Sequence, residues 1–252
     1  MYNIEDIKNT IICGDCLIEM QKIPDKSVDM ILCDLPYGTT ACKWDTIIPL
    51  EPLWEQYKRI IKDNGAIVLT ASQPYTSALV MSNIKMFKYE WIWEKHKGTN
   101  IFNVYKMPMK IHENICVFYS KQPTYNPQML DGFKDERRGL HNKQREGVFG
   151  EAKQLGYSEK HEPNKRFPKS IQKFSNHNQK ENRFHPTQKP VALFEYLIKT
   201  YTNEGDLVLD NCAGSGTTGV ACQNLKRNFI LIEKEEKYCE TIKQRLRQEI
   251  LL

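Results

Sequence analysis

The stretch from Asp206 to Glu233 constrains the fold more than any other part of the chain. It opens with Asp206-Leu-Val-Leu-Asp210, an apolar run short enough to be a buried strand. The glycine-rich turn Asn211-Cys-Ala-Gly-Ser-Gly-Thr-Thr218 follows, and the residues from Gly219 to Leu225 are typical of a helix. A second strand, Asn228-Phe-Ile-Leu-Ile-Glu233, then ends in an acid. Two strands joined by one helix predict an α/β sheet.

The turn in this unit has the chemistry of a cofactor site. Gly214-Ser-Gly-Thr-Thr-Gly219 satisfies the G-x-G-x-x-G pattern of a Rossmann-like sheet. Glycines let a ligand approach the backbone, the helix amino end offers free N–H groups, and Glu233 can accept hydrogen bonds from both hydroxyls of a ribose. The unit therefore predicts a ribose-containing cofactor, either a dinucleotide or S-adenosylmethionine. A plain tight turn is the alternative.

A second motif lies near the amino end. Asp34-Leu-Pro-Tyr37 follows the apolar run from Val28 to Cys33, which reads as a buried strand. The strand delivers a carboxylate, a stiff proline and an aromatic ring to the carboxyl edge of a sheet, where ligands bind. This combination suits a flat, amino-bearing heterocycle. The alternative is a turn that only ends the strand, with Asp34 as its cap.

The rest of the chain supplies the other elements of the sheet. We expect strands at 10–13, 66–70, 89–94 and 114–119, the last two paired. We expect helices at 16–23, 53–61 (closed by Asn64-Gly65), 74–83, 191–201 and 234–250, and an ordered loop at 39–49. A dehydrogenase usually starts with its glycine turn. Here the turn lies near the carboxyl end, so the amino-terminal half must complete the sheet.

Positive charge is concentrated between Lys121 and Phe184. This segment has 14 Lys and Arg against 8 Asp and Glu, whereas the remainder of the 252 residues has 22 against 23. Aromatic residues are spread through it: Tyr125, Phe133, Phe149, Tyr157, Phe167, Phe174 and Phe184. Cations that meet phosphates and rings that stack on bases suit nucleic acid, although a long solvated insertion is the simpler interpretation.

We expect a cytoplasmic protein with reduced cysteines and no membrane contact. No apolar run is long enough to span a bilayer, and the first residues lack a signal-peptide pattern. Cys13-Gly-Asp-Cys16 is a CxxC, but no second pair stands at zinc-ligand spacing, so no metal site is predicted. A thioredoxin-like redox role is a weaker alternative.

Taken together, the motifs resemble those of β-class DNA amino-methyltransferases. Asp34-Leu-Pro-Tyr37 is similar to the D-P-P-Y motif, and the stretch from Asp210 to Thr218 is similar to the cofactor motif D-P-F-x-G-S-G-T-T. Gly14-Asp-Cys16 resembles the G-D-C segment that precedes D-P-P-Y, and His185-Pro-Thr-Gln-Lys-Pro190 resembles the segment that precedes the cofactor motif. The circularly permuted order, with the catalytic motif first, is that of the β class.

The resemblance implies a fold and partners. The fold is α/β, the Rossmann-like S-adenosylmethionine-dependent methyltransferase fold, with a seven-stranded, mostly parallel sheet whose last strand is reversed. Residues 1–120 would be the catalytic half, 121–184 an inserted target-recognition region and 185–252 the cofactor-binding half. The substrate would be double-stranded DNA. The class also allows a homodimer, and either a restriction endonuclease partner or a solitary enzyme.

The resemblance assigns the catalytic roles to residues 34–37. Asp34 and the Leu35 carbonyl would accept the two N–H groups of the target amine, Pro36 would stiffen the turn, and Tyr37 would stack on the base once it is flipped out. The first proline of D-P-P-Y is Leu35 here, which removes one stiffening ring. An aspartate in first position favours N6 of adenine, because N4-cytosine enzymes more often carry serine.

The resemblance also assigns the S-adenosylmethionine contacts. Asp15 would meet the adenine end and Glu233 the ribose. The remaining contacts would lie around the methionine part and in the glycine turn: Thr187, Lys189, Asp210, Ala213, Gly214, Ser215, Gly216 and Thr217. The alternatives are that Asp15 is only a turn residue and that Lys189 is solvated. Asn211-Cys212 replaces the usual Pro-Phe, which removes an aromatic side chain from the cofactor motif.

Three other functions are weighed against N6-adenine methylation. The first is N4-cytosine methylation by the same fold. The second is a nicotinamide-dependent oxidoreductase that uses the glycine turn, and the third is a DNA-binding protein without catalysis. Neither of the last two explains Asp34-Leu-Pro-Tyr37.

Overall fold

The computed structural model describes residues 1–39, 45–132, 164–175 and 188–248. The chain divides into two compact units, one formed by Met1–Asn126 and Ser170–Leu252, the other by Pro127–Lys169. In the second unit, Leu130 and Arg166 pair through two backbone hydrogen bonds of 2.8 and 2.9 Å. The first unit contains the sheet and the predicted motifs, and it is described in the following paragraphs.

The first unit is built on one sheet with the strand order β1-β8-β7-β2-β3-β5-β4-β6. The strands are β1 (Thr10–Cys13), β2 (Val28–Asp34), β3 (Ile61–Ala71), β4 (Phe87–Thr99), β5 (Lys110–Phe118), β6 (Ile171–Phe174), β7 (Leu207–Asp210) and β8 (Asn228–Glu233). Only β5 is antiparallel to its neighbours among these strands. The predicted α/β fold with a mostly parallel sheet is confirmed.

The sheet differs from the expected one in two details. It has eight strands and not seven, because β6 adds to the edge by pairing in parallel with β4 from Ile92 to Lys95. This strand has four residues and lies in the polar segment 121–184, where no period of apolar residues marks it. The reversed strand, β5, is the fifth in the chain and lies inside the sheet, so it is not the last strand here.

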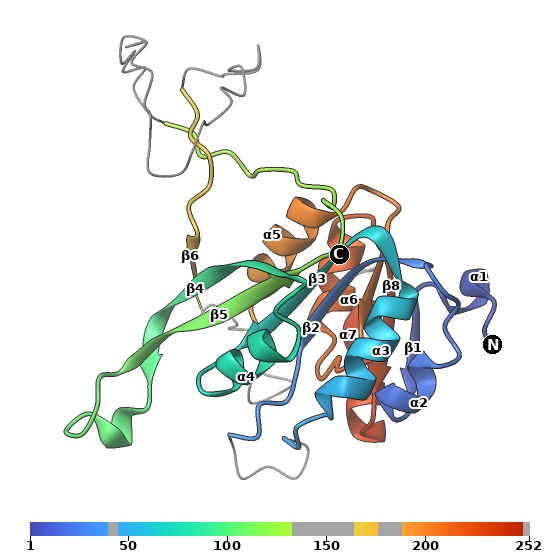
Figure 1. The fold of residues 1–252 in the computed structure, drawn as a ribbon, viewed down its shortest axis with the longest axis horizontal. Coiled ribbons are helices and arrows are strands. Elements are labelled where there is room, and N and C mark those ends of the chain that lie inside the picture. Colours follow the sequence, from blue (N-terminus) through green and yellow to red (C-terminus); the bar gives the residue numbers. More distant parts are fainter. Residues whose placement is uncertain (40–44, 133–163, 176–187, 249–252) are drawn as a thin grey trace. The chain divides into compact units, whose positions relative to one another are not determined.

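Helices cover both faces of the sheet (Figure 1). One face packs against α1 (Ile4–Ile7), α2 (Cys16–Met20), α3 (Leu50–Ile60) and α4 (Tyr75–Ser82), and the other against α5 (Val191–Tyr201), α6 (Thr217–Asn224) and α7 (Glu236–Gln248). Alternate residues of β2 serve the two cores: Ile31 and Cys33 face the first, Met30 and Leu32 the second. A strand buried on both faces reads as a continuous apolar run, which is how β2 is recognised in the sequence.

The end of α3 differs from the prediction. The helix ends at Ile60, and Asn64-Gly65 lies inside β3, where the register with β2 shifts. A Cβ on Gly65 would lie 2.7 Å from the Asp29 carbonyl oxygen. Glycine is therefore needed here for the close approach of two strands, and it does not close the helix.

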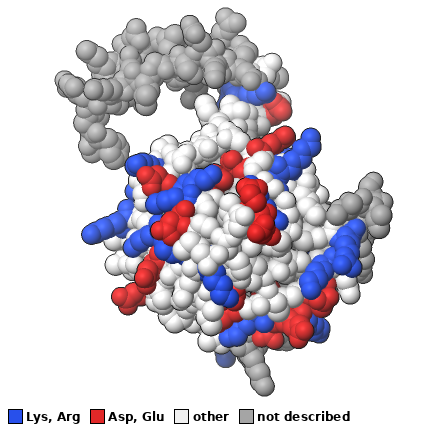
Figure 2. Space-filling view, turned by 90° about the vertical axis from the view of Figure 1, so that its right-hand side faces the viewer, with Lys and Arg blue, Asp and Glu red and all other residues white. Residues whose placement is uncertain are grey.

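Charges of both signs are intermixed on the face that carries α1 and α2 (Figure 2). Two of the ion pairs there are Lys8–Glu5 at 2.6 Å and Lys22–Glu19 at 2.8 Å. The described side chains in this view form no surface of one sign, unlike a surface that meets phosphates. Among the described residues, no helix is long and apolar enough to cross a membrane.

Candidate active site

The two sequence motifs meet at one edge of the sheet because β2 and β7 are parallel neighbours. Ile31 pairs with Leu209, so the segments after Asp34 and after Asp210 leave the sheet at the same carboxyl edge. The next strands outward, β3 and β8, end at this edge too. Asp34 and Asp210 are 176 residues apart in the chain, but the order of the strands brings them to the same edge of the sheet.

A cavity of about 760 Å³ opens at this edge, a size typical of small-molecule sites. Both motifs line it. Its wall includes almost every predicted site residue that the structure describes: Asp15, Asp34, Leu35, Pro36, Tyr37, Lys189, Asp210, Ala213, Gly214, Ser215, Thr217 and Glu233. Gly216 is the one described exception, and Thr187 lies outside the described residues.

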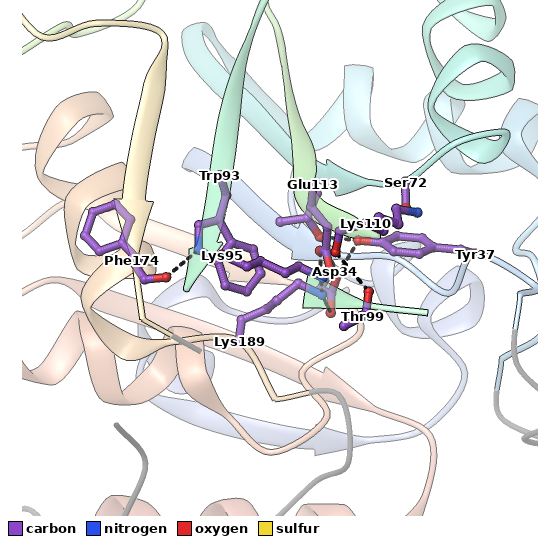
Figure 3. A network of polar contacts seen from close by, with 11 residues as sticks. Asp34, Tyr37, Ser72, Trp93, Lys95, Thr99, Lys110, Glu113, Phe174 and Lys189 are labelled. Atoms are coloured by element: carbon purple, nitrogen blue, oxygen red, sulfur yellow. Dashed lines mark hydrogen bonds and ion pairs between the residues drawn. The ribbon is translucent and has the colours of Figure 1, made fainter. Parts of the chain in front are cut away.

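Asp34 is the centre of a polar network at the cavity wall (Figure 3). Its Oδ1 accepts hydrogen bonds from the Tyr37 hydroxyl at 2.7 Å and from the Thr70 hydroxyl, and its Oδ2 accepts one from Lys189 Nζ at 2.7 Å. A carboxylate offers about four acceptor positions. Three are used, so one remains for an external N–H group.

Lys189 lies in the cavity wall beside Asp34, and its proposed place near the methionine carboxylate of the cofactor stays a prediction. Its side chain is 7% exposed, and its ammonium lies between Asp34 and Glu113, 2.7 and 3.2 Å from their carboxylate oxygens. Burial acts to lower the pKa of Lys189, but the two carboxylates outweigh it and the pKa is raised. Lys189 is therefore charged and not solvated, and its ammonium donates a hydrogen bond to the Asp34 carboxylate.

Glu113 is a site residue that the sequence reasoning missed. Burial acts to raise its pKa, but Lys189 and Lys95 together hold the pKa below its usual value. Lys95, Glu113, Lys189 and Asp34 thus form a chain of alternating charges, which we call the charge ladder. Because β5 runs antiparallel, the acid that begins its buried run lies at the edge where other strands end. The sequence signal that could have identified Glu113 is its position directly before the buried strand residues 114–118.

Tyr37 is held on three sides. Its ring stacks on Tyr75 with centroids 5.5 Å apart, its hydroxyl donates to Asp34, and Lys189 Nζ lies 5.6 Å from the ring centroid. Burial, with the nearby carboxylates of Asp34 and Glu113, raises the pKa of the Tyr37 hydroxyl. The hydroxyl therefore stays protonated at neutral pH and remains a donor to Asp34. The stacking of Tyr37 on a base stays a prediction.

The glycine turn presents backbone to the cavity. Gly214 N donates to Glu233 Oε2 at 2.7 Å, and Glu235 N donates to Glu233 Oε1 at 2.9 Å. Burial raises the pKa of Glu233. A Cβ on Gly214 would meet nothing nearer than the Cys212 carbonyl oxygen at 4.0 Å, so open space lies over this backbone. A ligand of the expected kind fits such a turn, since it can approach the main chain closely.

Gly216 offers a test of the turn. Its φ is 78°, and a Cβ there would lie 2.7 Å from Ile242 Cγ2. Gly216→Ala should lower the free energy of unfolding by about 1–3 kcal/mol and weaken cofactor binding, as urea titration and calorimetry would show. Gly205→Ala is the matched control, because its φ is 85° but nothing lies within 4 Å. An equal loss in both variants would mean that the Ile242 contact is unimportant.

Side chains around the glycine turn fix it and the start of the neighbouring helix α2. Asp15 caps α2 by accepting from Leu17 N at 3.0 Å, and it also lines the cavity. Arg245 of α7 donates to the Ser215 carbonyl at 3.0 Å and lies 3.3 Å from the Thr217 hydroxyl. Asn211, one of the departures from the family pattern, accepts a 2.5 Å hydrogen bond from the buried Tyr57 hydroxyl. Asn211 therefore anchors the turn to α3.

Asp210 is buried beneath the turn. Its carboxylate accepts from Cys212 N at 3.1 Å and from the Thr218 hydroxyl at 2.5 Å. Burial raises the pKa of Asp210 to about 7. The carboxyl therefore takes up a proton in the folded chain at pH values where it is ionised in the unfolded chain, whose ordinary value is 3.8.

This shift predicts a pH dependence of stability. The stabilisation from protonated Asp210 is complete below about pH 4 and is lost as the pH rises through about 7. Asp210→Asn cannot titrate, so the variant should gain roughly 4 kcal/mol relative to the wild type between pH 4 and pH 8. Urea unfolding of both proteins across this range would measure the difference. A difference that stays constant with pH would show that Asp210 titrates normally.

Comparison with known proteins adds an independent finding. The model of the family described as DNA methylase (N6_N4_Mtase) matches residues 28–244. The Type II methyltransferase M.HpaI of Haemophilus parainfluenzae is 27% identical, covering 95% of this chain and 74% of its own length. The Type II methyltransferase M.HinfI of Haemophilus influenzae is 26% identical, covering 98% of this chain and 70% of its own length.

Solved structures show the same fold. The crystal structure of the M1.HpyAVI–SAM complex is 27% identical, with a TM-score of 0.63, over 94% of this chain and 99% of that one. The PvuII DNA methyltransferase, described as cytosine-N4-specific, is 16% identical, with a TM-score of 0.69, over 94% of this chain and 85% of that one. At this identity the second likeness concerns the fold alone.

Proposed function

Because the chain belongs to the N6/N4 DNA methylase family, we propose that it methylates N6 of adenine within a specific duplex sequence. Family membership establishes a DNA methyltransferase that uses S-adenosylmethionine. The choice of adenine and the roles of individual residues are our proposal. The observation that carries it is the single cavity in which the Asp34 carboxylate and the glycine turn face the same space.

Asp34 and Leu35 are proposed to activate the target amine. An exocyclic amine on a base is a weak nucleophile, since its lone pair is delocalised into the ring. The remaining acceptor position of Asp34 and the Leu35 carbonyl can take one N–H each, which favours a more tetrahedral nitrogen. Holding this nitrogen in line with the methyl group of the cofactor would supply much of the acceleration. The Leu35 side chain is 2% exposed, so core packing holds the turn that a proline would otherwise stiffen.

The cofactor half of the cavity is proposed to hold S-adenosylmethionine, which supplies a methyl group already activated on a sulfonium. Glu233 would bind the ribose hydroxyls and Asp15 the adenine end. The backbone at Ala213, Gly214 and Gly216 would lie along the methionine part, and Thr187 near its carboxylate. The segment 121–184 is proposed to recognise DNA, because its positive charge suits phosphates.

The choice of adenine as the target base is based on Asp34, because cytosine enzymes of this family more often have serine at this position. Incubating the protein with methyl-labelled S-adenosylmethionine and unmethylated genomic DNA, followed by nucleoside analysis, tests the choice. We expect the label in N6-methyladenine. Label in N4-methylcytosine alone would overturn adenine but not the family, and no transfer to any DNA would overturn the proposed activity.

A further inference from the structure

The hairpin that joins β4 to β5 continues beyond the body of the sheet (Figure 1). Its end, residues 100–109, is called the hairpin tip. The tip contains η1 (Ile101–Asn103), and both Lys106 N and Met107 N donate to the Asn103 carbonyl, at 2.9 and 3.0 Å. A Cβ on Gly98 would lie 2.8 Å from Met109 Cε, so glycine lets Met109 pack across the hairpin. The tip is therefore a hydrogen-bonded turn of defined shape.

The hairpin tip exposes apolar side chains. Phe102 and Tyr105 are each 101% exposed and Ile101 is 64% exposed. Val104, Met107 and Met109 are also exposed. Scattered exposed apolar residues need no explanation, but six within ten consecutive residues form a patch of the kind that marks an interaction site. A partner is therefore expected to cover Phe102 and Tyr105.

The charge of the hairpin indicates which partner. Between Glu94 and Glu113 the chain has four lysines, Lys95, Lys97, Lys106 and Lys110, and no acidic residue. Lys95 belongs to the charge ladder, whereas Lys106 is exposed on the tip itself. Cations beside exposed aromatic rings complement a nucleic acid, because the lysines meet phosphates and the rings meet bases.

The hairpin also leads directly from the cavity. Thr99 and Lys110, the residues that flank the tip, line the cavity, as do Lys95 and Glu113 further in. Phe102 follows Thr99 by three positions in the chain, a reach of at most about 10 Å, or about three base steps. A base can reach Asp34 only after it leaves the duplex, and it stays attached to the strand. A duplex that delivers a base past Thr99 and Lys110 would therefore pass near the tip.

We infer that the hairpin tip is a DNA-contacting wedge, an inference that rests on the proposed function. Phe102 and Tyr105 contact the bases beside the flipped adenine, and Lys106 contacts a phosphate. Apolar side chains placed against base steps help to unstack them, and flipping opens a gap that such a ring can fill. The ligand of this surface is duplex DNA around the target, outside the segment 121–184.

A second copy of the chain is the other occupant that such a surface could have. In a two-fold contact the same patch meets itself, which would bring the lysines of two tips together with no acid between them. Like charges oppose such a contact, whereas the phosphates of DNA neutralise the same lysines. The charge of the tip thus favours DNA.

The test compares Phe102→Ala/Tyr105→Ala and Lys106→Glu with two controls, Met81→Ala on α4 and Lys58→Glu on α3, both at exposed positions. The probe is unmethylated genomic DNA with labelled S-adenosylmethionine. The double variant should raise KM for DNA about tenfold or more, with unchanged affinity for the cofactor and unchanged melting temperature. Lys106→Glu should weaken the salt dependence of DNA binding, and both controls should match the wild type.

Two results would overturn the wedge. One is a double variant with the wild-type KM for DNA at every salt concentration. The other is a wild-type dimer that the double variant converts to a monomer in sedimentation, with KM for DNA unchanged. If the wild type transfers no methyl group to any DNA, the proposed function fails. The wedge is then decided separately by the affinity of each variant for a fluorescent duplex, where equal affinities would overturn it.

Discussion

Asp34→Ala should abolish methyl transfer while leaving S-adenosylmethionine binding largely intact. The side chain accepts hydrogen bonds from Tyr37, Thr70 and Lys189 and keeps one acceptor position for the target amine. Removing it takes away both the activation of the amine and the anchor of the network, so kcat should fall by about 10⁴-fold or more, below detection. Single-turnover transfer to DNA and calorimetry with the cofactor measure the two effects.

Asp34→Asn is the matched variant, since it keeps the shape and removes the charge. It should also lose turnover, because an amide nitrogen cannot accept the hydrogen bonds that one carboxylate oxygen now receives. Near-normal turnover in either variant would remove Asp34 from the mechanism. A loss of cofactor affinity equal to the loss of rate would mean that Asp34 shapes the whole cavity and not the amine site.

Lys189→Met should produce the second large effect. It removes the ammonium that contacts both carboxylates, and so leaves the half-buried Asp34 and the buried Glu113 without their shared cation. Breaking a buried ion pair in this way costs about 3–5 kcal/mol, so the variant should unfold at lower urea concentration. Turnover should also fall, because Lys189 orients the Asp34 carboxylate.

The kinetics of Lys189→Met decide between two roles of the lysine. If it acts through Asp34, kcat falls and KM for S-adenosylmethionine changes little. If it binds the methionine carboxylate, as the family resemblance implies, KM for the cofactor rises instead. Glu113→Gln is the companion variant, since it weakens the other side of the charge ladder without touching Asp34. Unchanged stability and kcat in both variants would contradict the charge ladder as a functional unit.

Much of the fold could be predicted because its signals are local. The run from Val28 to Cys33 and the glycine turn after Asp210 each show their structure within ten residues. Their meeting at one cavity follows from the neighbouring positions of β2 and β7. The family match then replaces the nicotinamide-dependent oxidoreductase as the explanation of the glycine turn.

The other features of the fold and the site depend on tertiary contacts, which no local sequence pattern predicts. Glu113 becomes a site residue only because β5 is reversed, and Lys189 turns to Asp34 only because the two lie at the same sheet edge. Gly65 resembles a helix end in sequence, yet it serves a close approach of β3 to β2. The four-residue strand β6 forms through its pairing with β4, and its sequence, Ile-Gln-Lys-Phe, has no alternation that marks a strand.

The central claim is that this cavity, through Asp34, methylates adenine in one DNA sequence context. Sequencing the modified bases in DNA from cells that express the wild-type chain, beside cells that express Asp34→Ala, tests it most directly. We predict N6-methyladenine in a single short sequence context with the wild type and none with the variant. The same modification with both proteins, or no modified adenine with either, would contradict it.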